Sequence, residues 1–254
     1  MKELTAEQIQ DNWQQLRNII TDTFEGERLE KLNKMYDYFE DRMCIAPASG
    51  TEYFHYAHVG GYVEHILHVI DLSVKIKDMW KQNGAIINFS DEELIFAAMH
   101  HDLGKVGDMN KDYYIPQESE WHRKNQGSIF SHNSELQYMT VTDRAIYLLN
   151  QFGITMTEWE YVGLRLTDGL YEEANKKYYI NYGKGNSLKS NIAYILHQAD
   201  SMATHIEYDE WENSQKQEEI KVQGNVDNIK KAVTMKETSE ELSKKSKDLF
   251  DELF

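Results

Sequence analysis

The chain has 254 residues, of which 41% are hydrophobic, so it can bury a substantial core without disulfide bonds or structural metal ions. Its single cysteine, Cys44, excludes an intramolecular disulfide, and its apolar segments are too short for a membrane span. The formal net charge of −16 opposes attraction to a polyanion such as long duplex nucleic acid. Because the N-terminus is too polar for a secretory signal, we expect a cytoplasmic protein with no membrane partner.

Most of the sequence predicts helix, and the expected fold class is all-α: a helical bundle with long irregular loops and a charged C-terminal helical extension. Two capping boxes, "TAEQ" at 5–8 and "SDEE" at 90–93, each precede apolar residues at helical spacing. The expected helices span residues 6–23, 26–44, 60–82, 91–103, 134–151, 157–167 and 188–210. Residues 104–133 and 168–188 show no sustained period and are interpreted as long loops, the first with room for a short hairpin.

Three regions are expected along the chain. Residues 1–44 form N-terminal helices that pack on the core, residues 45–213 form the main domain, and residues 214–254 form a charged linker with a C-terminal amphipathic helix. A third capping box, Thr238 to Glu241, begins that last helix. Its apolar face is expected either to dock on its own domain or to bind a partner, including a second copy in a homo-oligomer.

Ionisable side chains interrupt three apolar helices. His65 and His68 lie three residues apart, and therefore on one face, in the helix 60–82. The helix 91–103 is apolar on most sides and ends in His-His-Asp at residues 100–102, while Asp200 lies within the apolar stripe of a late helix. A buried ionised aspartate costs several kcal/mol unless it is paired or bound to a metal. The pattern therefore predicts a cation at the point where these helices meet.

A histidine on one helix, a His-Asp pair in "HDLGK" at 101–105 and a single late aspartate resemble the HD superfamily of metal-dependent phosphohydrolases. The resemblance covers roughly residues 45–210. The upstream segment "APASGTEYFHYAHVGGYVEHILHV" is similar to the entry segment of YhaM-type exoribonuclease HD domains, in which a Gly-Gly pair precedes the first ligand histidine.

The resemblance implies that four side chains bind the metal: His65, His101, Asp102 and Asp200. Two imidazoles and two carboxylates suit a divalent transition metal (Mn, Fe, Co, Ni or Zn), with Mg less well suited. Catalysis is expected to involve Asp102 and Lys105, which either neutralises a phosphate or pairs with an acid.

Further residues are candidates for a second metal or for substrate: His122, His132 and Asp168. His132 is expected to open a helix, as a ligand or as a cap. Two-metal members of the superfamily would carry another histidine where this chain has Thr167 and Asp168, although Asp168 offers a substitute oxygen ligand. The absence of a histidine at this position favours a single metal per chain.

Candidate substrate-binding residues are His58, Arg123, Lys124, Tyr171 and Lys177. For His55 and His58, in the loop before the first ligand helix, functional and structural interpretations are equally open. His68 shares a helix face with His65, and His197 shares one with Asp200. Both are interpreted as core residues or as residues that orient the ligands.

The expected function is that of a phosphohydrolase in which a metal-activated water cleaves a phosphate ester or anhydride of a nucleotide or short oligonucleotide. Two alternatives remain open: a diiron oxygenase on the same scaffold, and a non-catalytic HD binding protein that engages a partner through residues 214–254. Metal content separates the first alternative from the hydrolase, and the Asp102→Ala variant separates the second.

Overall fold

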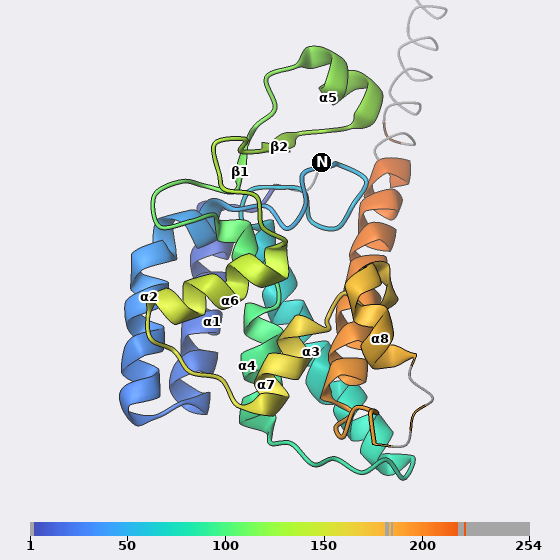
Figure 1. Ribbon diagram of the computed structural model, residues 1–254. Helices are drawn as coiled ribbons and strands as arrows, with labels where there is room; N and C mark the ends of the chain where they lie inside the picture. The colour runs from blue at the N-terminus through green and yellow to red at the C-terminus, as the bar shows by residue number, and fades with distance from the viewer. Residues whose placement is uncertain (1–2, 181–182, 184, 218–220, 222–254) are drawn as a thin grey trace, which may run out of the picture. The chain divides into compact units, whose positions relative to one another are not determined.

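The computed structural model describes residues 3–180, 183, 185–217 and 221, and the chain divides into two compact units, residues 1–211 and 212–254. The first unit is mostly helical (Figure 1). Its labelled helices are α1 (Ala6–Thr23), α2 (Gly26–Ile45), α3 (Gly61–Gln82), α4 (Asp91–His100), α5 (Glu120–Gln126), α6 (Val141–Gln151), α7 (Glu158–Arg165) and α8 (Lys176–Tyr179). Residues 192–217 are also helical, and residues 192–211 of this late helix belong to the first unit. The predicted C-terminal helix from Thr238 lies outside the described residues.

Helix starts follow the local capping chemistry of the sequence. Thr5 and Gln8 form a reciprocal capping box at α1, with the Thr5 amide donating to Gln8 Oε1 at 2.9 Å. Ser90 and Glu93 do the same at α4, where the Ser90 amide donates to Glu93 Oε2 at 2.9 Å. Both predicted boxes are thus confirmed. Among the described residues, no helix is long and apolar enough to cross a bilayer.

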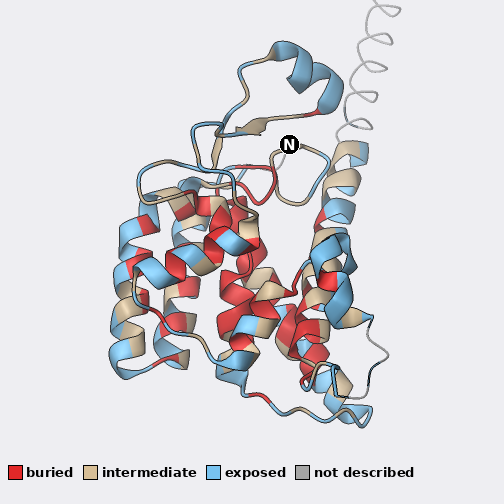
Figure 2. Ribbon diagram, viewed as in Figure 1, coloured by how far each residue is buried: buried red, intermediate tan, exposed pale blue. Residues whose placement is uncertain are grey.

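The core of the first unit lies around α3 and α4 (Figure 2). α3 packs against α4, α4 packs against α7, and α1 and α2 both contact α3. The late helix runs antiparallel to α3, because Trp80 Nε1 donates to Gln198 Oε1 at 3.0 Å near one end while His68 contacts Glu207 near the other. Polar groups on α3 and the late helix are therefore held face to face.

The Gly-Gly pair at the start of α3 has a steric explanation. Gly60 has a φ of +83°, a left-handed conformation that favours glycine. A Cβ on Gly61 would lie 2.1 Å from the carbonyl oxygen of Tyr56. The loop of residues 46–60 thus passes directly over the N-terminus of α3, which brings it close to the polar residues on that helix.

The helix expected over 91–103 ends at His100. Leu103–Val106 form a separate turn of 3-10 helix, η1, and Asp102 lies between the two with φ −102° and ψ 10°. Gly104 allows this turn to approach the start of α6, because a Cβ there would lie 2.1 Å from the carbonyl oxygen of Val141. The glycine of "HDLGK" is therefore required by packing.

The helix expected over 134–151 begins later, at Val141, because Thr140 caps it by accepting a hydrogen bond from the Asp143 amide at 3.0 Å. His132 does not open a helix, so that prediction was wrong: it ends strand β2 (Phe130–His132), which pairs antiparallel with β1 (Tyr114–Pro116). The short hairpin expected in the first loop is present, with α5 in its connection. The second expected loop contains the 3-10 turns η2 (Gly169–Tyr171) and η3 (Glu173–Asn175) and then α8.

We expect Gly104→Ala to lower the free energy of unfolding by about 2 kcal/mol or more, because its methyl group would overlap a backbone carbonyl in a packed core. Urea denaturation followed by circular dichroism measures the loss. Gly84→Ala is the control: its Cβ would meet nothing within 4 Å, so only the strain of its positive φ remains, about 1 kcal/mol. Equal losses in the two variants would show that the approach to Val141 is not tight.

Candidate metal centre

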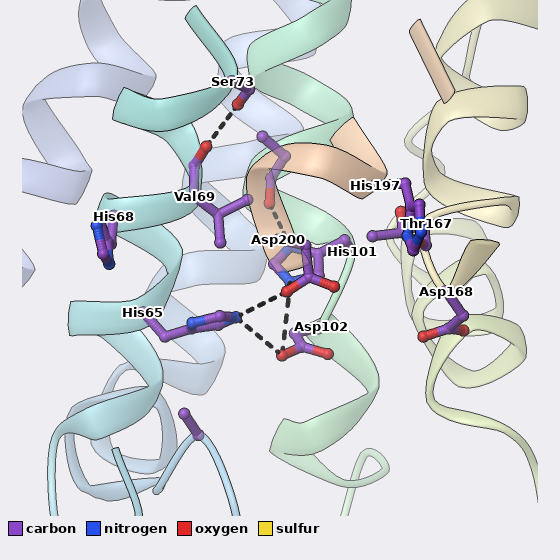
Figure 3. A network of polar contacts seen from close by, with 12 residues as sticks. His65, His68, Val69, Ser73, His101, Asp102, Thr167, Asp168, His197 and Asp200 are labelled. Carbon is purple, nitrogen blue, oxygen red and sulfur yellow. Dashed lines mark hydrogen bonds and ion pairs between the residues drawn. The ribbon is translucent and has the colours of Figure 1, made fainter. Parts of the chain in front are cut away.

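Four side chains from three separate parts of the fold converge on one point (Figure 3). His65 comes from α3, His101 and Asp102 from the end of α4 and the turn that follows, and Asp200 from the late helix. His65 Nε2 lies 3.3 Å from Asp200 Oδ1 and 3.7 Å from Asp102 Oδ2. His101 Nε2 lies 3.6 Å from each of the same two oxygens. All four side chains that the HD resemblance singled out are thus within reach of one ion.

The two imidazoles present their Nε2 atoms to this point. The Nδ1 atom of His101 donates to the Ala98 carbonyl at 2.7 Å, and that of His65 contacts Glu207 at 3.0 Å. The two Nε2 atoms are buried and make no hydrogen bond of normal geometry within the described part of the chain. Donors around an ion with bonds of about 2.1 Å lie roughly 3 to 3.5 Å apart, which is close to the observed spacing. The geometry therefore fits a metal ion.

The charges at this point favour a divalent cation. Asp102, Asp200 and Glu207 are three acids that contact His65, and Lys105 pairs with one of them, Asp102. Lys105 Nζ lies 2.6 Å from Asp102 Oδ2 and also donates to the Ala48 carbonyl at 2.7 Å. With neutral imidazoles, two negative charges remain uncompensated, and a divalent ion would balance them.

Protons on the imidazoles compensate part of the same negative charge. Burial disfavours the charged form of His65, but Glu207 and Asp200 outweigh it and raise the pKa of His65 to about 10. Burial likewise opposes protonation of His101, whose pKa is nevertheless raised by Asp102 and Asp200. Burial opposes ionisation of Asp200, but its bonds to the two histidines hold its pKa well below the usual range. The carboxylates thus favour protonated imidazoles at the point where a metal ion could otherwise bind.

Glu207 was not found from the sequence. It is fully buried, its Oε1 lies 2.8 Å from His68 Nδ1, and both of its oxygens lie 3.0 Å from His65 Nδ1. Burial opposes its ionisation, but the two histidines lower the pKa of Glu207 to about 2. The available signal was its position seven residues after Asp200, two helical turns along the same face. His68 and Glu207 therefore help to hold His65 in place.

His197, the other residue expected to orient a ligand, is held by a different segment. Its Nδ1 donates to the Thr167 carbonyl at 2.7 Å. A Cβ on Gly169 would lie 2.5 Å from its ring, so the backbone after α7 packs closely on the imidazole. His197 thus links the late helix to this turn.

The candidates on α5 and β2 lie elsewhere. His122, Arg123 and Lys124 are exposed on α5, where the His122 ring contacts Ser119 Oγ at 2.7 Å and Lys124 pairs with Glu120 at 3.4 Å. His132 packs against the ring of Tyr113, with centroids 4.8 Å apart. In the described part of the chain, neither His122 nor His132 belongs to a group of converging metal-ligand atoms.

Asp168 lies near the centre but outside its ligand set. Its Oδ2 accepts a hydrogen bond from Thr142 Oγ1 at 3.2 Å. Burial, together with the negative charges of Asp102 and Asp200, raises the pKa of Asp168. It therefore faces the same region as Asp102 and Asp200 without joining the converging group (Figure 3).

A cavity of about 570 Å³ opens beside Asp200. Its wall is largely aromatic and imidazole in character and comprises Tyr53, Phe54, His55, Asp168, Tyr171, His197, Asp200, Ser201, Thr204, His205 and Tyr208. Tyr171, a predicted substrate-binding residue, lies at its edge and is 85% exposed.

Two other predicted substrate-binding residues do not line this cavity. His58 is buried, with Nδ1 3.1 Å from the Val59 carbonyl and Nε2 3.4 Å from Glu64 Oε2. Lys177 lies over the ring of Tyr178, with its Nζ 5.3 Å from the ring centroid. Both side chains are engaged by their neighbours.

No protein-family model, curated protein or solved structure matches this chain. The interpretation of the centre consequently depends on its own geometry and chemistry.

We expect Glu207→Gln to weaken Mn²⁺ or Zn²⁺ binding by about 10- to 100-fold, because a neutral amide holds the His65 imidazole less well than a carboxylate. Competition with a chromophoric chelator measures the affinity. Asp209→Asn, an exposed substitution on the same helix, should leave it unchanged. An unaltered affinity in Glu207→Gln would show that Glu207 does not support the centre.

The raised pKa of His65 predicts opposite pH effects in the absence and presence of metal. Because the folded pKa of about 10 exceeds the ordinary 6.5, protonation stabilises the folded state fully below pH 6.5, and this contribution is lost as the pH rises toward 10. In a chelator, the melting temperature should therefore fall over this range. The increase in melting temperature produced by added Mn²⁺ or Zn²⁺ should become larger as the pH rises, because the ion requires neutral imidazole. A metal-induced shift independent of pH would contradict this assignment.

Proposed function

We propose that the chain is a metal-dependent phosphohydrolase of the HD type, which cleaves a phosphate ester or anhydride of a nucleotide or short oligonucleotide. The observation that carries the proposal is the convergence of two imidazole Nε2 atoms and two carboxylates, with separations of 3.3 to 3.7 Å. One divalent transition metal per chain, bound by His65, His101, Asp102 and Asp200, would acidify a water molecule and polarise a phosphoryl oxygen.

The protein's own residues would keep these ligands in the required state. Lys105, at 2.6 Å from Asp102, favours the ionised carboxylate and fixes its position. Glu207 directs the Nε2 lone pair of His65 inward by holding Nδ1. Because Lys105 is already paired with Asp102 and the Ala48 carbonyl, we assign it a positioning role at the metal centre.

The cavity supports a substrate of nucleotide size. Its volume of about 570 Å³ falls within the range of ordinary small-molecule sites. Tyr53, Phe54 and Tyr208 offer aromatic faces on which a base can stack, while Asp200 in the same wall connects the cavity to the ligands. The net charge of −16 favours a short, locally neutralised phosphate over a long polyanion.

We expect the purified chain, supplied with Mn²⁺, Co²⁺, Ni²⁺ or Mg²⁺, to release product from at least one member of a panel of small phosphate compounds. The panel contains nucleoside mono- and triphosphates, cyclic nucleotides and short single strands. Asp102→Ala should reduce turnover to background, because it removes a ligand and the partner of Lys105. Asp71→Asn, on the exposed side of α3, should retain it.

Turnover that survives Asp102→Ala would mean that the reaction occurs at another site. Two irons per chain with oxygen-dependent turnover would favour the oxygenase. Metal binding without turnover of any compound in the panel would count against the hydrolase.

A further inference from the structure

His55 is a partly buried histidine that the four-ligand centre leaves unexplained. Both of its ring nitrogens are buried and have no hydrogen-bond partner among the described residues. Its ring centroid lies 4.7 Å from that of His65, with 37° between the planes. Buried polar groups without partners are rare because each costs free energy, so such a group at the edge of a metal centre indicates a missing ligand.

The loop that carries His55 is held in a defined position. The amides of Ala48 and His58 both donate to the Tyr56 carbonyl, at 3.1 and 2.9 Å. Tyr56 itself has a φ of +39°, which is costly for a residue with a side chain. Lys105 further ties the loop to the centre through the Ala48 carbonyl. The surrounding contacts thus maintain a strained backbone immediately beside His55.

The ligand atoms form two overlapping groups. His65, His101 and Asp200 make one, and His55, His65 and Asp102 make the other; within each group all ligand atoms lie within 4.8 Å of one another. His65 belongs to both, and its Nδ1 is already taken by Glu207. The remaining nitrogen has one lone pair, so it can bind a single ion. Two ions therefore cannot occupy the two groups at once through His65.

We propose that His55 is a fifth protein ligand of that one ion, which would be bound by three imidazoles and two carboxylates. This inference rests on the metal centre of the proposed function and extends it. Five protein donors leave one position on a six-coordinate ion and exceed the four of a tetrahedral zinc site. The site should accordingly prefer Mn²⁺, Fe²⁺, Co²⁺ or Ni²⁺ in six-coordination, which keeps one position for the water molecule of the proposed function, and the added imidazole disfavours Mg²⁺.

The test compares the affinities of the wild-type chain, His55→Ala and His58→Ala for Mn²⁺ and Co²⁺, by competition with a chromophoric chelator. His58 is the matched control, because it is a buried histidine of the same loop whose ring contacts Glu64 and Val59 instead. We expect His55→Ala to weaken binding at least about tenfold and His58→Ala to leave it unchanged. Circular dichroism and thermal melting in a chelator establish that each variant is folded.

A second measurement needs no substitution. X-ray absorption at the cobalt edge of the wild-type protein counts imidazole ligands from their outer-sphere scattering, and we expect three. Two imidazoles, or equal affinities of the wild-type chain and His55→Ala, would overturn the role of His55 while leaving the four-ligand centre intact. A wild-type chain that binds neither metal would overturn the centre itself, and the role of His55 with it.

Discussion

The structure depends on one electrostatic constraint: acids buried beside too few cations. Asp102, Asp200 and Glu207 approach one imidazole, and Lys105 is the lysine that pairs with this group. Burying uncompensated charge is expensive, so the folded state must attract positive charge to this point, as protons on the histidines or as a metal ion. The same constraint that would destabilise an ordinary core favours protonated imidazoles here and would favour a bound cation.

Tight packing gives that charge cluster its geometry. Glycine at 61 lets the loop of residues 46–60 pass over the start of α3, and glycine at 104 lets the turn after Asp102 approach α6. Glu207, fully buried on the late helix, fixes the tautomer of His65 from behind. The candidate ligands are thus oriented by contacts that extend well beyond those four side chains, which is how proteins generally tune metal sites.

The centre joins an aromatic cavity on one side and a strained loop on the other. Asp200 belongs both to the ligand set and to the cavity wall, so a molecule bound in the cavity would lie directly beside an ion. His55 likewise faces both, as a lining residue of the cavity and a neighbour of His65. Substrate binding and metal coordination would therefore share side chains, which connects the proposed specificity with the proposed chemistry.

The sequence by itself determined the features that depend on neighbours along the chain. Capping boxes at Thr5 and Ser90 placed the starts of two helices, and apolar periodicity showed that the early chain is helical. A resemblance carried by "HDLGK" also singled out the four candidate ligands, whose side chains the structure brings together. Local signals failed where a longer-range contact decided: His132 became the end of a strand because β2 pairs with β1. The roles of Glu207 and His55 beside His65 could be assigned only from the tertiary structure. The charge and burial around each side chain depend on which distant segments meet, and the periodicity of a single helix contains no information about those contacts.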